Sequence, residues 1–349
     1  MPAHSSHSSY SDPVDLTIQL MSIDSTSGRE GQVIAWLDDY LRERGWRTQR
    51  IPVSEGRDDL FATVVDAPLV TLSTHLDTVP PYIPPTRDAD RIYGRGSCDA
   101  KGVAAAMICA AERLRDAGLP IALLFVVGEE VSHDGAHAAN AAFAAKTVLA
   151  TNRVMINGEP TESTLALGTK GALRVIVRTT GKAAHSAYPH LGHSATRDLV
   201  HLLADLDSLQ LPSDALLGDT TINIGALSGG VADNVMAPAA EARLMTRLVT
   251  PSREMMRIIT EWADGRATLE WGSTVEPVKL AVVDGFDTSV AAFATDIPAL
   301  PNWGTPFLYG PGSILVAHTD GEFIAIDELE ASIAGYERLV RLTLATGPA

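Results

Sequence analysis

The chain has 349 residues, 46% of them hydrophobic, which is enough for two packed domains. Lys and Arg total 27 against 43 Asp and Glu, giving a formal net charge of -16. Because an acidic surface repels phosphate backbones and anionic lipids, we expect no nucleic-acid or membrane-surface partner. No apolar run in the sequence is long enough to span a bilayer.

The amino-terminal residues are polar. Met1 to Ser11 is rich in Ser and His and lacks the apolar region of a secretory signal, so residues 1–12 are predicted to form a flexible tail. The two cysteines, Cys98 and Cys109, fall in a predicted loop and in the helix that follows it. This placement disfavours a disulfide, and we therefore expect a protein of the reducing cytoplasm.

The first half of the chain alternates predicted helices and strands. Residues 27–30, Ser-Gly-Arg-Glu, have the pattern of a capping box, and apolar residues at helical spacing follow as far as Gly45. Further along, the predicted elements are strands over 61–65 and 69–72, a helix over 101–117, a strand over 121–127, a helix over 136–145 and a strand over 154–156. This alternation predicts an α/β fold, mainly a parallel sheet with helices on both faces.

The pattern changes after Lys170. The expected elements are a strand over 173–178, a helix over 196–206, strands over 221–226 and 240–249, a helix over 253–262 and a strand over 268–271. The order βαββαβ predicts an inserted two-layer lid or dimerisation domain at 171–277. Residues 13–170 and 278–349 are then expected to form one discontinuous catalytic domain, which ends in a helix over 329–344.

Six side chains of the metal-binding type stand in short motifs outside the predicted insert. They are His75, Asp99, Glu129, Glu130, Glu159 and His318. Those that follow predicted strands lie past the carboxyl ends, where open α/β sheets bind ligands. This set of oxygen and nitrogen donors suits zinc, cobalt or manganese, and it is large enough for two ions that share one carboxylate. A paired-metal site can make hydroxide near neutral pH, which favours a hydrolase.

Each motif alone allows a structural interpretation. Asp77 is placed to accept the second ring N–H of His75, as carboxylates near metal-bound histidines do. By itself, Asp99 at the start of a predicted helix is typical of an N-cap residue. The pair Glu129-Glu130 by itself is typical of a solvated turn. With a metal nearby, one acid of that pair can bind it while the other acts as a general base. His185 alone reads as a surface histidine.

Taken together, the motifs resemble one family. It is the dinuclear-zinc deacylase and carboxypeptidase family that includes acetylornithine deacetylase and succinyl-diaminopimelate desuccinylase. The resemblance runs from about residue 13 to the end, and includes the metal motifs, Gly-Lys-Ala-Ala-His at 181–185 and the segment 229–238. The segments 309–313 and 318–323 look like those of the acetylornithine and acetylcitrulline deacetylases in particular.

The resemblance implies a role for each motif residue. Asp99 would bridge two ions, with His75 and Glu159 completing one site and Glu130 and His318 the other. Glu129 would be the general base, Asp77 would be a catalytic residue that orients His75, and the peptide bond after Asp99 would be cis. His185 would steady the oxyanion, often from the partner subunit. Asn234 and Arg247 would hold the substrate carboxylate, with Gly312 and Ser313 nearby. Ala100 and Met245 depart from the family's usual Met and Asp.

The resemblance therefore implies a homodimeric amidase with two divalent ions, most often Zn²⁺, with Co²⁺ or Mn²⁺ as alternatives. The expected substrate is a small N-acyl amino acid such as N-acetylornithine, N-acetylcitrulline or N-acetyl-lysine, in arginine or lysine biosynthesis. The alternative is a dipeptidase or carboxypeptidase of the same family. A catalytically inactive binding protein is a remote alternative, since such a relative would have lost a ligand or the base, and all are present here.

Overall fold

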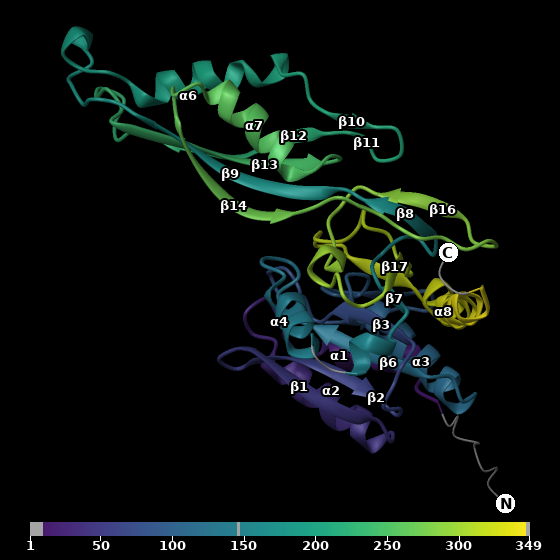
Figure 1. Ribbon diagram of the computed structural model, residues 1–349. Helices are drawn as coiled ribbons and strands as arrows, with labels where there is room; N and C mark the ends of the chain where they lie inside the picture. Colours follow the sequence, from purple (N-terminus) through teal and green to yellow (C-terminus); the bar gives the residue numbers. More distant parts are fainter. Residues whose placement is uncertain (1–9, 145–146, 347–349) are drawn as a thin grey trace, which may run out of the picture. The chain divides into compact units, whose positions relative to one another are not determined.

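The computed structural model describes residues 10–144 and 147–346, so most of the predicted tail lies outside the described residues. The chain divides into two compact units. The first comprises Met1–Leu167, Leu280–Ser289 and Thr295–Ala349, and the second Gly168–Lys279 and Val290–Ala294 (Figure 1). Within the described residues, no helix combines the length and apolar character that a membrane span needs.

A six-stranded sheet forms the centre of the first unit. Its order is β1 (Arg47–Ser54), β2 (Arg57–Thr63), β6 (Ile121–Val126), β3 (Val70–His75), β7 (Val154–Asn157) and β17 (Thr305–Leu308). The strands from β6 to β17 are parallel, whereas β2 is antiparallel to both β1 and β6. The mainly parallel sheet is thus confirmed, with an antiparallel hairpin at one edge whose strand β1 the sequence pattern did not indicate.

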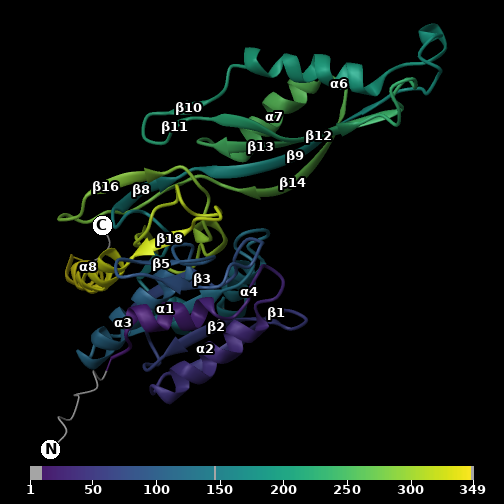
Figure 2. The same cartoon turned by 180° about the vertical axis from the view of Figure 1, so that it is seen from behind.

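Helices cover both faces of this sheet (Figures 1 and 2). One face carries α1 (Pro13–Met21), α2 (Gly31–Glu43), α3 (Lys101–Asp116) and α8 (Ile326–Thr346), whose buried side chains share a hydrophobic core. On the other face, α4 (Asp134–Phe143) packs through Phe143 against Phe61 of β2, with ring centroids 4.7 Å apart. The short helix α5 (Thr147–Thr151) precedes β7.

The predicted capping box before α2 is wrong. The N-cap residue is Glu30, and no side chain caps the helix. The Glu30 carboxylate instead accepts a hydrogen bond from Arg57 Nε at 2.9 Å, and the Ser27 hydroxyl donates to Asp77 Oδ2 at 2.8 Å. Both side chains are thus engaged by charged tertiary partners, Arg57 and Asp77, instead of capping the helix.

The last residues of the predicted tail, among those that the structure describes, are packed. Ser11 is buried, and its backbone N–H and its hydroxyl both donate to the Glu112 carboxylate, at 2.7 and 2.9 Å. Glu112 is itself buried on α3, and a buried carboxylate requires such donors. The segment from Ser11 onward is therefore part of the packed unit.

Two three-stranded sheets lie outside the six-stranded sheet. One has the order β18 (Phe323–Ala325), β5 (Arg91–Tyr93) and β4 (Thr86–Arg87). The other has the order β15 (Val278–Lys279), β8 (Leu165–Thr169) and β16 (Thr288–Ala291).

The second unit is the two-layer βαββαβ unit that the sequence predicts. Its antiparallel sheet has the order β12 (Thr221–Gly229), β13 (Ala239–Leu248), β9 (Gly171–Thr180) and β14 (Thr268–Val275). Helices α6 (Ala195–Ala204) and α7 (Ser252–Ala263) share one core with a single face of this sheet. A two-stranded hairpin, β10 (Ser213–Asp214) and β11 (Gly218–Asp219), lies between α6 and β12 in the chain.

Candidate metal centre and active site

The carboxyl ends of three parallel strands carry the candidate ligands in the first unit. His75 is the last residue of β3, Glu129 and Glu130 follow β6, and Glu159 follows β7. The strand register sets His75 opposite Val126 of β6, so these strand ends lie at one edge of the sheet. Residues separated by tens of positions in the chain are thereby brought together.

Two groups of potential ligands share the Asp99 carboxylate. In the first group, His75 Nε2 lies 3.1 Å from Asp99 Oδ1 and 3.9 Å from Glu159 Oε2. In the second, His318 Nε2 lies 3.2 Å from Asp99 Oδ2 and 3.0 Å from Glu130 Oε2. Each Asp99 oxygen thus faces a different imidazole, as a carboxylate between two cations would.

Asp99 is not a helix cap. The N-cap position of α3 is Ala100, and no side chain caps that helix end. The peptide bond between Asp99 and Ala100 is cis, as the resemblance implies. With the Asp99 carboxylate turned to the two histidines, the structural alternative for this residue is not supported.

Asp77 holds the other ligand segments in place. Its Oδ1 accepts the backbone N–H of Glu129 at 3.0 Å, and its Oδ2 that of Glu130 at 3.2 Å. The second ring nitrogen of His75 is closer to the Asp77 carbonyl, at 3.0 Å, than to its carboxylate, at 3.5 Å. Although burial opposes ionisation, hydrogen bonds from His75 and Ser27 lower the Asp77 pKa below its usual value.

The electrostatics of the cluster fit divalent cations. Burial, together with the charge of Glu159, raises the Glu129 pKa well above its usual value, and burial likewise raises that of Glu159. Glu159 Oε1 is buried and has no hydrogen-bond partner. Buried acids that repel one another and retain an unpaired oxygen are stabilised by a cation, and the donor set of imidazole and carboxylate suits zinc, cobalt or manganese.

A third group of side chains was missed by the sequence patterns. His133 Nδ1 lies 2.8 Å from Asp296 Oδ1 and 3.8 Å from Glu129 Oε1. The only signal in the sequence is that His133 follows Glu129 by four positions, and Asp296 stands in no motif. Neither ligand group that shares Asp99 includes His133 or Asp296.

In the second unit, His185 and Asn234 lie side by side and Arg247 lies far from both. The Asn234 carbonyl accepts the Ser186 N–H at 2.9 Å, and His185 forms a β-bridge with Val235. Arg247 stands near the other end of β13, where it is paired with Ala172. Arg247 follows Ala239, the first residue of β13, by eight positions, which span about 26 Å at ~3.3 Å per residue. Within one unit, a small carboxylate cannot contact both ends.

The predicted substrate loop of the first unit is tied to neighbouring acids. The Gly312 N–H donates to Glu328 Oε1 at 2.8 Å, and the Ser313 hydroxyl to Glu162 Oε1 at 2.6 Å. These four residues line a cavity of about 410 Å³ together with Val316 and residues 323–325.

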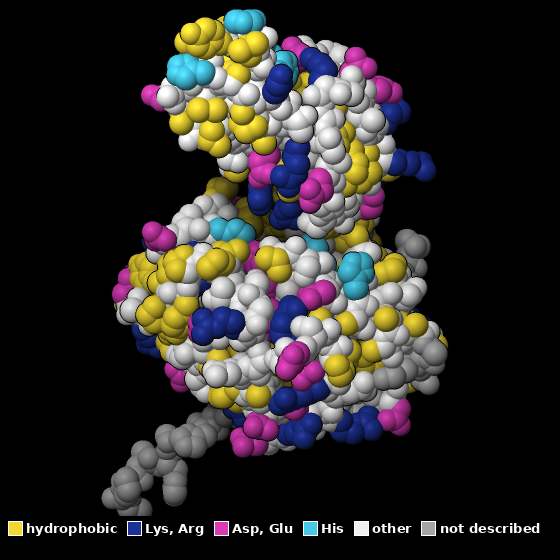
Figure 3. Space-filling model, turned by 90° about the vertical axis from the view of Figure 1, so that its left-hand side faces the viewer, with side chains coloured by type: hydrophobic (Ala, Val, Ile, Leu, Met, Phe, Trp, Pro, Cys, Tyr) yellow, Lys and Arg dark blue, Asp and Glu magenta, His cyan; other side chains and the backbone are white. Residues whose placement is uncertain are grey.

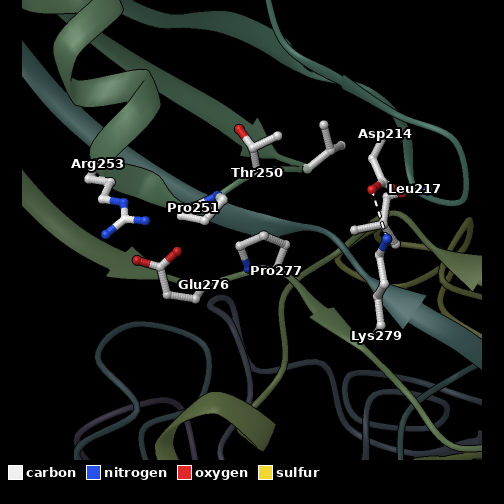
Figure 4. Close-up of a pocket in the computed structure, with 9 residues that line it drawn as sticks. Asp214, Leu217, Thr250, Pro251, Arg253, Glu276, Pro277 and Lys279 are labelled. Atoms are coloured by element: carbon white, nitrogen blue, oxygen red, sulfur yellow. Dashed lines mark hydrogen bonds and ion pairs between the residues drawn. The ribbon is translucent and has the colours of Figure 1, made fainter.

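A larger cavity of about 670 Å³ lies wholly in the second unit (Figure 4). Of its charged groups, Asp214 and Lys279 pair with each other at 2.9 Å, and Glu276 accepts the backbone N–H of Ser252 at the start of α7. None of the sequence-predicted site residues lines it. The chemistry of the candidate site therefore belongs to the Asp99 cluster.

The fold and the cluster together define a class, the α/β metallohydrolases whose ligands gather at the carboxyl edge of a mainly parallel sheet. The chain belongs to peptidase family M20/M25/M40, whose model matches residues 71–342. The family is the one that the sequence motifs resemble, and fungal relatives within it are described as probable carboxypeptidases rather than as acetylornithine deacetylases.

A protein of Aspergillus clavatus described as a probable carboxypeptidase is 37% identical, over 93% of this chain and 81% of that protein. Among solved structures, the dipeptidase Dug1p of Saccharomyces cerevisiae has a TM-score of 0.78 at 11% identity, covering 96% of each chain. The Bacillus subtilis YXEP protein, described as a dinuclear metal binding peptidase, has a TM-score of 0.69 at 14% identity, covering 96% of this chain and 98% of that one.

Proposed function

We propose that this protein is a metal-dependent carboxypeptidase or dipeptidase that cleaves the amide bond of a small peptide next to a free carboxylate. The observation that carries the proposal is the Asp99 carboxylate shared between two ligand groups, with Glu129 beside them and outside both. His75 and Glu159 would hold one ion, and Glu130 and His318 the other. The likeness to a carboxypeptidase at 37% identity supports the peptide substrate.

In this proposal, Glu129 moves the proton. The chemistry that bound divalent ions supply is a lowered pKa of a water molecule and a polarised scissile carbonyl. Glu129 accepts the proton of the attacking water and later returns it to the departing amine. Asp77 fixes the backbone of Glu129, and His133, paired with Asp296, lies 3.8 Å from the Glu129 carboxylate. The His185 imidazole donates to the oxyanion of the tetrahedral intermediate.

The second candidate function is deacylation of an N-acyl amino acid such as N-acetylornithine, N-acetylcitrulline or N-acetyl-lysine, which would place the enzyme in arginine or lysine biosynthesis. It is favoured by the segments 309–313 and 318–323, which resemble those of the acetylornithine and acetylcitrulline deacetylases. Both reactions break an amide bond beside an α-carboxylate, so the same residues serve either.

A substrate panel separates the two functions. We compare dipeptides with N-acetyl amino acids that have the same carboxyl-terminal residue, using the zinc- or cobalt-loaded protein. We expect kcat/KM for the dipeptides to be at least about 10-fold higher, because a second amino acid adds contacts that the acetyl group lacks. Initial rates of amine release measure this. The opposite order would assign the deacylase function, and no hydrolysis of either class by the metal-loaded protein would reject the proposal.

We further propose that the active protein is a homodimer in which His185 serves the partner's metal cluster. His185 and Asn234 are exposed, and they lie at the opposite end of the sheet from Arg247, so a second copy is needed if all three are to contact one small substrate. Strand β12 is an edge strand with exposed Ile224 and Leu227, and exposed edges pair with other chains. Figure 3 shows hydrophobic and histidine side chains gathered at one end of this unit.

Subunit mixing tests this arrangement. His185→Ala should keep both metals and lose at least about 100-fold in turnover, the scale for an oxyanion donor. Exchange of His185→Ala with Glu129→Gln subunits should then restore part of the activity, because each hybrid dimer holds one intact composite site. Each variant alone serves as the control. Heterodimers of confirmed composition without recovery would exclude action between subunits.

A further inference from the structure

Glu322 is a buried carboxylate that accepts several backbone hydrogen bonds from the loop bearing Asp99. Its side chain is 0% exposed. A single oxygen, Oε1, accepts the backbone N–H groups of Gly96 at 2.9 Å, Cys98 at 3.2 Å and Asp99 at 3.3 Å. The segment that presents Asp99 is therefore arranged around the charge of one side chain that is distant in sequence.

The other oxygen of Glu322 carries an ion pair that reaches the His318 segment. Arg95 Nη1 lies 2.6 Å from Glu322 Oε2, and Arg95 is itself buried. The same nitrogen donates to the carbonyl of Thr319, the residue after His318, at 3.2 Å. In addition, the Gly94 N–H donates to the backbone carbonyl of Glu322 at 3.0 Å. Arg95 and Glu322 thus connect the segments of two ligands, Asp99 and His318.

The His318 segment is a turn with few anchors of its own. The Thr319 N–H and hydroxyl both donate to the Val316 carbonyl, at 3.4 and 2.7 Å, and Ala317 is buried in the core. His318 lies outside helices and strands, its side chain is exposed, and its φ of 63° is in the left-handed region, which is uncommon for residues other than glycine. By contrast, His75 ends a buried strand, and Glu130 is held through its backbone by Asp77. Arg95 and Glu322 are thus the side chains that join the His318 segment directly to the loop bearing Asp99.

We propose that Glu322, paired with Arg95, is a positioning residue that sets the spacing between Asp99 and His318 and thereby the affinity of the ligand group Asp99, Glu130 and His318 for a divalent cation. The inference rests on the metal centre of the proposed function. Residues that orient metal ligands without touching the metal typically contribute about 10- to 100-fold in affinity. Glu322 touches no proposed ligand side chain, and it acts through the backbone of the Asp99 loop.

The test is titration of the metal-free protein with Zn²⁺ and with Co²⁺. Glu322→Gln keeps the shape of the side chain and removes its charge. We expect at least one of the two bound ions to bind about 10-fold or more weakly. The visible spectrum of the cobalt form, which reports coordination geometry, should also change. Amide hydrogen exchange in the peptide covering residues 96–99 should be faster. Glu337→Gln is the matched control, because Glu337 also pairs with an arginine, Arg113 at 3.2 Å, on α8 away from the Asp99 loop.

A second variant covers the case in which Glu322→Gln does not fold because it leaves the Arg95 charge buried and unpaired. The double variant Arg95→Gln with Glu322→Gln removes both charges and is measured in the same way. Wild-type metal affinity and an unchanged cobalt spectrum in a folded variant would overturn the inference, as would weaker metal binding without faster exchange at residues 96–99. If the wild-type protein itself bound no metal, the proposed function would fail first, and the wild-type titration identifies that outcome.

Discussion

Glu129→Gln is expected to keep both metals bound while kcat falls by at least about 100-fold, the usual scale for loss of a general base. The amide has the shape of the carboxylate, but it cannot accept a proton from water. Neither of the two ligand groups that share Asp99 includes Glu129, so the metal content should not change. Elemental analysis of the purified protein and initial-rate kinetics measure the two quantities.

Glu55→Gln is the matched control for this prediction, because Glu55 is exposed in the turn between β1 and β2. It should leave both metal content and kcat unchanged. Near-normal turnover by Glu129→Gln would assign the proton transfer to another group, and His133, 3.8 Å from Glu129, would then be the next residue to change.

Asp99→Ala is expected to empty or disorder both metal positions and to abolish turnover. One carboxylate faces both His75 and His318, so its loss removes a ligand from each group and leaves the two imidazoles without the anion between them. His318→Ala is the comparison, and it should weaken mainly one position because His318 belongs to one group only. Metal content after dialysis, together with titration of the metal-free protein, distinguishes the two variants.

Two tightly bound ions in Asp99→Ala would refute the bridging role. A variant that fails to fold is recognised by circular dichroism, and Asp99→Asn, which keeps the volume of the side chain, then takes its place with the same expected direction. Equal losses of both ions in His318→Ala would show that the two positions are coupled through more than Asp99.

Local sequence patterns are enough to predict the mainly parallel sheet, the βαββαβ insert and the short motifs that carry the candidate ligands. These features are local: a buried strand is a run of apolar residues, a helix has its own period, and a polar residue directly after a strand end is visible in the chain. His75, Glu129 and Glu159 could be singled out in this way, and the family resemblance supplied their relation to Asp99 and His318.

The side chains that hold the ligands in place can be identified only in the folded protein. Ser27, which fits the pattern of a capping box, donates its hydroxyl hydrogen to Asp77 instead. Glu322 accepts hydrogen bonds from the Asp99 loop although the two are more than two hundred residues apart in the chain. The pairing of His133 with Asp296 likewise joins distant segments. Such contacts follow from packing rather than from periodicity, because a buried polar group accepts whichever donor the fold brings near it, and no local pattern records that choice.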